Sequence, residues 1–257
     1  MALKPMLFNT GMVQAILSGQ KTCTRRLVKP QPTRPYIIEK TPTGFWMDMK
    51  TGEGTDYQYK PPCHPGDILY VRETWGDYRE CSLSGEDGYY YLYRADYPDG
   101  ATSVPLPESE RTDYADSYDL PRWRPSIHMP KEAARIFLRV TDVRVERLHT
   151  SFFEPICPIF AVQAEGVDVG DTCRECIENY GVPCCVDTID EDGSNLYGGE
   201  CGMLDENRGK FSDLWDSTIK PADLDRYGWA ANPWVWAIRF ERISKEAALG
   251  GESDGKN

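Results

Sequence analysis

Short runs of alternating apolar and polar residues, separated by glycine and proline, constrain the fold of this chain most strongly. The clearest run covers residues 136–146, with a bend or bulge at Thr141-Asp142, and residues 233–243 repeat the pattern. Alternation with a period of two predicts half-buried strands. The 257 residues include 22 Gly, 19 Pro, 15 Tyr and 7 Trp. That composition favours turns and short strands over a helical bundle.

The remaining segments predict a sheet with a few helices. Further strands are predicted at residues 36–38, 44–47, 67–75 and 88–94, the first two as a hairpin. Helices are predicted at residues 10–18 and 159–165, and around an apolar face of Phe211, Leu214, Trp215 and Ile219. Asn9 or Thr10 would cap the first helix. Together these elements predict an α+β fold: a small mixed or antiparallel β-barrel flanked by helices.

We expect one domain over residues 1–243 with long loop insertions and a flexible, charged tail over 244–257. The predicted insertions lie near residues 76–88, 97–130 and 168–206. Acidic residues concentrate at 107–119 and 187–206. These acidic segments could contact a protein partner, or could serve solubility alone.

Charge and hydropathy exclude several classes of protein. The net charge of −12 argues against an extended groove for duplex nucleic acid, because proteins that wrap a duplex are normally basic. The first residues have neither the long apolar run nor the cleavage site of a signal peptide. No stretch approaches the ~20 apolar residues of a membrane helix. We therefore expect a cytoplasmic protein that does not enter a membrane.

The densest group of functional side chains is the segment Gly-Gln-Lys-Thr-Cys-Thr-Arg-Arg at residues 19–26. Gly19 can end the preceding helix in a left-handed conformation. The segment then presents an ammonium, hydroxyls and two guanidiniums within a few residues. Such a group fits an anion or a polar planar ligand such as a nucleobase. The alternative is a solvated basic turn.

This motif carries a resemblance to a known family. Gly19-x-Lys21-x-x-x-x-Arg26 after the first helix, followed by a strand ending in Val71-Arg72-Glu73, resembles the ASCH domain family. The resemblance covers about residues 5–75 and implies a fold similar to the PUA barrel of RNA-modifying enzymes. The layout also resembles phage-encoded ASCH-like proteins, which would place the chain in the host cytoplasm.

The family includes small amidohydrolases that remove the acetyl group from N4-acetylcytidine. The resemblance implies that Lys21, Thr24 and Glu73 are the catalytic residues. The Thr24 hydroxyl would attack once the Lys21 amine takes its proton, and Glu73 would position water or return a proton. The alternatives are a turn-capping role for Thr24 and an ion pair with Arg26 for Glu73. The insertions distinguish this chain from the compact amidohydrolases.

Other residues are candidates for binding the substrate. Arg25 or Arg26 could hold an oxyanion or a phosphate. Aromatic and imidazole side chains could flank a base, although packing is the commoner role for such residues. These candidates are Tyr70, Trp75, Trp123 and His128.

Cysteines cluster in the last of the predicted insertions. Cys173 and Cys176 form a Cys-x-x-Cys hook, which is typical of half of a structural zinc site. Cys184 or Cys185, with Cys201, would complete four ligands. The segment is polar and Gly-rich, so a metal would stabilise it. The alternative is a loop with incidental thiols.

Two classes of function remain open from the sequence, and a third is compatible with it. The chain could be an enzyme, either an amidohydrolase acting on an N4-acylated cytidine or a ribonuclease. It could instead be a module that binds a modified nucleoside or single-stranded RNA without turnover. The third class is a phage assembly or accessory factor that uses its insertions as contact surfaces. A structural zinc is the only cofactor that the sequence suggests.

Overall fold

The structure is a computed structural model that describes eight stretches of the chain. They are residues 2–32, 38–40, 46–48, 58–80, 88–97, 123–149, 164–167 and 202–250. The strands are β1 (Leu3–Leu7), β2 (Cys23–Leu27), β3 (Ile38–Lys40), β4 (Trp46–Asp48), β5 (Gln58–Tyr59), β6 (Ile68–Arg72), β7 (Trp75–Glu80), β8 (Gly88–Tyr93), β9 (Phe137–Arg147) and β10 (Trp234–Ile243). The α-helices are α1 (Thr10–Leu17), α4 (Gly202–Ser217), α5 (Leu224–Tyr227) and α6 (Lys245–Leu249). Short 3-10 helices are η1 (Arg94–Asp96), η3 (Ser126–His128), η4 (Lys131–Ala133), η6 (Pro221–Asp223) and η7 (Trp229–Ala231).

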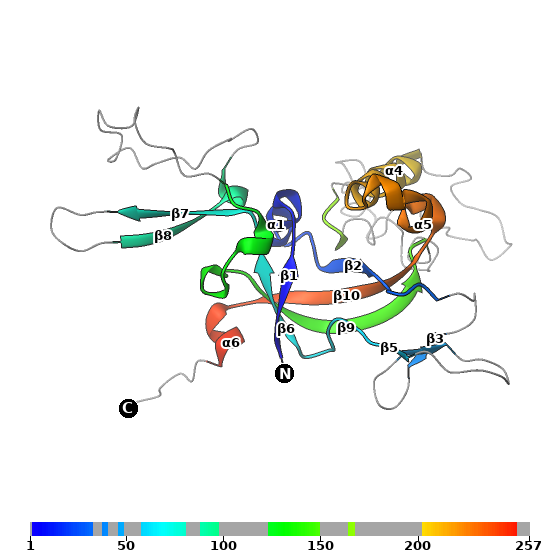
Figure 1. Cartoon of the computed structure of the whole chain (residues 1–257), viewed down its shortest axis with the longest axis horizontal. Helices are drawn as coiled ribbons and strands as arrows, with labels where there is room; N and C mark the ends of the chain where they lie inside the picture. Colours follow the sequence, from blue (N-terminus) through cyan, green and yellow to red (C-terminus); the bar gives the residue numbers. More distant parts are fainter. Residues whose placement is uncertain are drawn as a thin grey trace, which may run out of the picture. The chain divides into compact units, whose positions relative to one another are not determined.

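A mixed sheet of five strands is the main element, in the order β1-β6-β9-β10-β2 (Figure 1). Strands β1 and β6 are parallel, whereas β6 pairs antiparallel with β9 and β10 pairs antiparallel with β2. A three-stranded sheet, β3-β4-β5, and the hairpin β7-β8 complete the described strands. The α+β class is therefore confirmed. The five described strands form an open order with β1 and β2 at its ends, and no closed barrel is found among them.

Contacts divide the chain into two compact units, and strands β9 and β10 each contribute to both. Unit 1 comprises residues 1–19, 66–139 and 241–257, and unit 2 comprises residues 20–65 and 140–240. The single domain expected over residues 1–243 stays a prediction.

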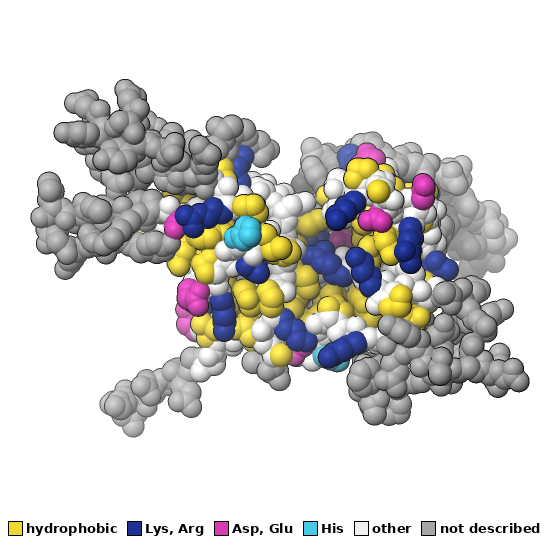
Figure 2. Space-filling model, in the orientation of Figure 1, with side chains coloured by type: hydrophobic (Ala, Val, Ile, Leu, Met, Phe, Trp, Pro, Cys, Tyr) yellow, Lys and Arg dark blue, Asp and Glu magenta, His cyan; other side chains and the backbone are white. Residues whose placement is uncertain are grey.

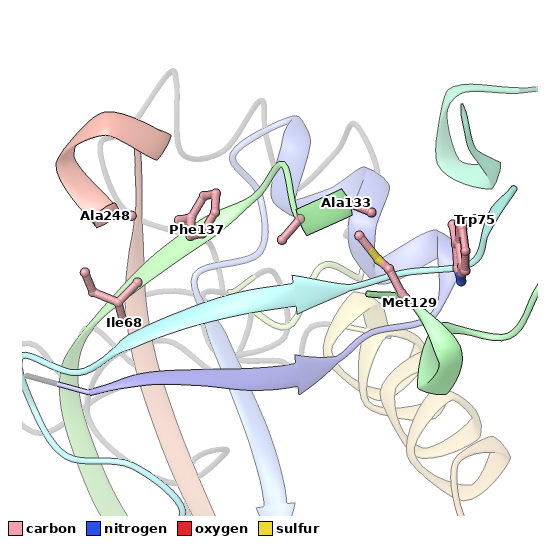
Figure 3. Packing of buried hydrophobic residues seen from close by; sticks show 7 residues of the cluster. Ile68, Trp75, Met129, Ala133, Phe137 and Ala248 are labelled. Atoms are coloured by element: carbon pink, nitrogen blue, oxygen red, sulfur yellow. The ribbon is translucent and has the colours of Figure 1, made fainter. Parts of the chain in front are cut away.

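The core of unit 1 gathers around β6 and β9. Figure 3 shows side chains from β6, β7, β9, α6 and the segment around η4 in this cluster. Its buried members are Ile68, Trp75, Met129, Ala133, Ala134, Phe137 and Ala248. Helix α6 begins after Ser244, whose side chain accepts a hydrogen bond from the Ala247 amide. The first residues of the expected flexible tail are therefore helical, and residues 251–257 lie outside the described part.

The core of unit 2 is formed where α4 packs against β2 and β10. Its buried members are Leu148, Val167, Phe211, Trp215 and Val235. Leu27, Leu214, Ile219 and Trp229 pack against this cluster. The amphipathic face predicted around Phe211 and Trp215 is thus confirmed, and helices α4 and α5 lie on the same side of β2 and β10 (Figure 1).

Local signals in the sequence explain the entry into the motif segment. Asn9 caps α1 by accepting a hydrogen bond from the Met12 amide at 2.8 Å. Val13 and Ile16 are buried on the expected face. Gly19 then adopts a φ of 80°, a conformation that other residues resist. The chain therefore leaves α1 in a tight turn and enters β2 directly. Among the described helices, none is both long and apolar enough to cross a bilayer.

Candidate functional site

Strand β2 positions the candidate site in unit 2. The sequence leaves a solvated basic turn open as the alternative for residues 19–26, but Cys23–Leu27 form an end strand that pairs with β10. Thr22 extends this pairing, because its carbonyl accepts from the Phe240 amide at 2.9 Å. The Thr22 amide donates instead to the carbonyl of Ala164, the residue before Glu165, also at 2.9 Å. Side chains alternate along a strand, so Cys23 and Arg25 share one face.

The carboxylate of Glu165 meets this face of β2 and contacts both Lys21 and Arg25. The Lys21 ammonium lies 2.7 Å from Glu165 Oε2 and also donates to the Glu165 backbone carbonyl at 2.9 Å. Arg25 donates to Glu165 Oε1 at 2.5 Å. The Lys21 side chain is 0% exposed, and those of Arg25 and Glu165 are each 5% exposed. Two buried cations therefore share one buried carboxylate.

The charges around Glu165 determine its protonation. Burial by itself raises the pKa of the Glu165 carboxyl, but Lys21 and Arg25 outweigh burial and hold that pKa below its usual range. The neighbouring Cys23 thiol responds in the opposite direction. Burial, reinforced by the charge of Glu165, raises the pKa of Cys23 to about 12. The thiol is therefore protonated at neutral pH and serves as a weak donor rather than a nucleophile.

Arg25 also contacts residues outside the cluster that Lys21, Arg25 and Glu165 form. Its second terminal nitrogen lies 3.3 Å from Glu146 Oε1, and its guanidinium carbon lies 5.8 Å from the centre of the Phe211 ring. Burial alone would lower the pKa of Arg25, but Glu165 leads the interactions that raise it instead. Within the described residues, Arg25 Nε is buried and has no hydrogen-bond acceptor. One donor of the cluster thus remains available for an acceptor that the described residues do not supply.

Thr24 and Arg26 belong to the other face of β2. Thr24 is buried opposite Ile238 of β10, and Arg26 is opposite Trp236. Arg26 donates to the Arg25 carbonyl at 3.2 Å. Burial lowers the pKa of Arg26, and the charge of Glu165 acts in the opposite direction. The structure therefore keeps Lys21, Thr24 and both arginines on one short segment but divides Thr24 from Arg25 by strand alternation.

Glu73 lies in unit 1 and has a different partner from the one expected. Its two carboxylate oxygens accept from Arg135 Nε at 2.9 Å and from Arg135 Nη2 at 3.0 Å. Arg135 also contacts Asp96 at 2.7 Å, and its guanidinium lies 3.9 Å from the centre of the Tyr93 ring. Burial raises the pKa of Glu73 even though Arg135 opposes the shift. The described ion pair of Glu73 is with Arg135, not with Arg26.

The aromatic candidates from the sequence are placed as follows. Trp75 is buried in the unit 1 core, with the Arg124 guanidinium 4.9 Å from the centre of its ring. Tyr70 is partly buried against the same core. Trp123 contacts the Tyr97 ring at a centroid distance of 5.6 Å. The structure thus assigns packing contacts to Trp75 and Tyr70.

His128 and the cysteine candidates complete the comparison with the sequence. His128 ends η3 and is exposed. Cys173, Cys176, Cys184, Cys185 and Cys201 all lie outside the described residues. Where side chains are described, no group of three or more potential ligands is arranged to hold a metal. The zinc site stays a prediction.

The residue that sequence reasoning missed is Glu165. It ends a predicted helix in the run Ala-Val-Gln-Ala-Glu-Gly-Val at residues 161–167. The structure has a helical Ala164, then Glu165, then Gly166 with a φ of 83°, and Val167 returns to the core. A lone carboxylate between apolar residues, next to a glycine, is the signal that could have found it. Its partners lie 140 and 144 residues away in the chain, so no local pattern identifies them.

Comparison with known proteins identifies no relative of this chain. No family model matches the chain, and neither the curated proteins nor the solved structures contain a match.

Proposed function

We propose that this protein has an ASCH-type, PUA-like fold and hydrolyses the exocyclic N-acyl group of a modified cytidine at the β2 site. The observation that carries the proposal is the buried ion pair of Lys21 with Glu165, at 2.7 Å, in which Lys21 lies three residues before Thr24 in sequence. A buried pair of titratable groups is a typical acid–base element of an active site. In this proposal Glu165 takes the role that the sequence assigns to Glu73.

The reaction begins with the transfer of one proton from Lys21 to Glu165. When the proton passes from the Lys21 ammonium to the Glu165 carboxylate, the pair becomes neutral and its net charge does not change. The Lys21 amine then takes the proton of the Thr24 hydroxyl as its oxygen attacks the acyl carbon. The bond between that carbon and the exocyclic nitrogen breaks, and the Glu165 carboxylic acid gives its proton to the leaving nitrogen. The ion pair is thereby restored.

Water completes the reaction in a second step. It attacks the acyl carbon of the Thr24 ester, the carboxylic acid leaves, and the Thr24 hydroxyl regains its proton. In both steps a negative charge develops on the acyl oxygen. Arg26 would stabilise that charge, because Arg25 already contacts Glu165 and Glu146.

The alternation along β2 supports a second candidate, a module that reads a modified base without turnover. Thr24 lies on the face of β2 opposite Arg25, whereas a nucleophile must come within reach of its base. In such a module the unpartnered Arg25 Nε would donate to a carbonyl of the base. The enzyme needs the Thr24 hydroxyl as its nucleophile, whereas the module binds the base without it.

The deciding experiment is the deacetylation of N4-acetylcytidine by the purified protein, followed by chromatography. Thr24→Val should abolish turnover, Thr24→Ser should retain part of it, and Glu165→Gln should remove it. Lys21→Ala should also be inactive. No turnover by the parent protein, with binding of the nucleoside retained, would favour the reading module. Loss of turnover in Glu73→Gln but not in Glu165→Gln would return the catalytic role to Glu73.

A further inference from the structure

We propose that Lys29, Arg226 and Tyr227 form a binding surface for single-stranded RNA, so that the modified cytidine reaches the β2 site as part of an RNA chain. This inference deepens the proposed function and rests on it. We call these three residues the Tyr227 surface. All three belong to unit 2, as do Lys21, Arg25 and Glu165.

Two exposed cations lie next to one aromatic ring in this surface. The Lys29 ammonium is 5.7 Å, and the Arg226 guanidinium carbon 5.1 Å, from the centre of the Tyr227 ring. The main chain at the ring is held in place, because Trp215 Nε1 donates to the Tyr227 carbonyl at 2.8 Å. Figure 2 shows several Lys and Arg side chains, with a few Asp and Glu side chains among them, in the region that α4 and α5 occupy in Figure 1.

The two cations have no direct ion-pair partner among the described carboxylates. Neither Lys29 nor Arg226 forms an ion pair within the described part of the chain. Asp223 and Asp225 are the nearest acidic residues to Arg226 in sequence, and neither is paired with it. The two cations are therefore available to contact the phosphates of a polyanion.

The spacing of the three groups fits a single strand of nucleic acid. Both cations lie within 6 Å of one ring centre, so they are close enough to contact neighbouring phosphates of one strand. An aromatic ring between phosphate-binding cations can stack with an unpaired base. A duplex keeps its bases stacked on each other, and an acidic peptide has no planar base for the ring. The combination therefore favours single-stranded RNA over both.

Strand β2 connects this surface to the proposed catalytic site. Lys29 follows Arg25 by four residues, and Val28 extends the pairing with β10 by donating to the Trp234 carbonyl at 3.0 Å. With a rise of about 3.3 Å per residue, the two positions are about 13 Å apart along the strand. A few nucleotides span that distance. The base that reacts and the bases that anchor the chain would then belong to one short RNA segment.

Binding of a short, fluorescently labelled single-stranded RNA, measured by anisotropy over a range of salt concentrations, tests this inference. The double variant Lys29→Gln/Arg226→Gln should bind more weakly, and the steepness of log K against log salt should fall by about 1.4, because each neutralised phosphate of a single strand contributes about 0.7. The matched control is Lys131→Gln/Lys245→Gln, which removes the same charge from exposed positions of unit 1. This control should keep the parent slope.

The ring is tested separately from the charge. Tyr227→Ala should weaken binding about 5- to 100-fold, whereas Tyr227→Phe, which keeps the ring, should bind like the parent protein. Equal losses of RNA affinity in Lys29→Gln/Arg226→Gln and in the control Lys131→Gln/Lys245→Gln would overturn the inference. An unchanged affinity in Tyr227→Ala would also overturn it. Displacement of the RNA by poly-glutamate as readily as by unlabelled RNA would also overturn it.

Activity on the free nucleoside separates this inference from the proposed function. The Lys29/Arg226 double variant should deacetylate free N4-acetylcytidine at the parent rate but should lose activity on an oligonucleotide that carries the same base. If the parent protein binds RNA through the Tyr227 surface and deacetylates neither substrate, the proposed function fails and the RNA surface stands. If the parent protein deacetylates both and the double variant is unimpaired on both, the RNA surface fails alone.

Discussion

Replacement of Glu165 by glutamine should destabilise the fold more than the same replacement of Glu146, the other carboxylate that contacts Arg25. The substitution keeps the size of the side chain but leaves two buried cations, Lys21 and Arg25, without their shared counter-ion. Removal of one partner from a buried ion pair costs about 3–5 kcal/mol. Lys21 keeps its hydrogen bond to the backbone carbonyl of residue 165, and Arg25 keeps Glu146. We therefore expect a loss near the lower limit, about 3 kcal/mol.

Glu146→Gln is the matched control for this prediction. Glu146 lies 3.3 Å from Arg25 and its side chain is 18% exposed, so the loss of its charge should cost less than about 1 kcal/mol. Thermal unfolding followed by tryptophan fluorescence should show a midpoint about 6–12 °C lower for Glu165→Gln. The control should move by no more than about 4 °C.

Equal midpoints for the two variants would refute the assignment of Glu165 as the shared counter-ion. Lys21→Met, alone and combined with Glu165→Gln, completes a double-mutant cycle. A coupling free energy of at least about 1 kcal/mol is expected between two residues in direct contact. A coupling free energy near zero would show that the pair does not form in solution.

Three further predictions address other parts of the fold. Because the pKa of Glu165 is lowered in the folded state, its ionised form stabilises the fold above the ordinary pKa of 4.5, and this contribution disappears as the pH falls further. The difference in stability between the parent protein and Glu165→Gln, measured by urea unfolding, should therefore narrow below pH 4.5. Arg135→Lys should lower the free energy of unfolding by about 2 kcal/mol, because lysine cannot contact both oxygens of the buried Glu73; thermal unfolding measures this loss. Gln31→Ala should speed hydrogen exchange at the Trp234 amide, which donates to Gln31 Oε1 at 2.7 Å, and should cost about 1–3 kcal/mol.

Local patterns predicted most of the regular elements. The alternation at residues 136–146 and 233–243 corresponds to β9 and β10, and the aromatic run at 88–94 corresponds to β8. The expected hairpin is present as β3 and β4. These elements carry their own signal, because each needs only one buried face and a neighbouring strand.

The elements that sequence reasoning missed depend on distant partners. Strand β1 contains Pro5, which weakens a strand pattern, yet an end position of the sheet tolerates a residue without an amide proton. The predicted strand at 67–75 is interrupted at Glu73 and Thr74, and the Glu73 carboxylate pairs with Arg135, 62 residues further along the chain. In β2 the charged Arg25 is buried against two carboxylates from distant parts of the chain, those of Glu165 and Glu146. The side chains of β2 do alternate between two faces, but charged residues on both faces leave no alternation of apolar and polar residues in the sequence.

Besides the reach of Thr24, the enzyme candidate depends on the proton shared by Lys21 and Glu165. A base at this site requires that proton to lie on the carboxylate, whereas the lowered pKa of Glu165 favours the carboxylate form. Arg25 contributes to this preference because it contacts the same carboxylate. A bound ligand that excludes water and draws Arg25 away through its unpartnered Nε would raise the pKa of Glu165 and release the Lys21 amine. Arg25 would then couple recognition of the base to activation of Thr24, and without that coupling the same residues would only bind.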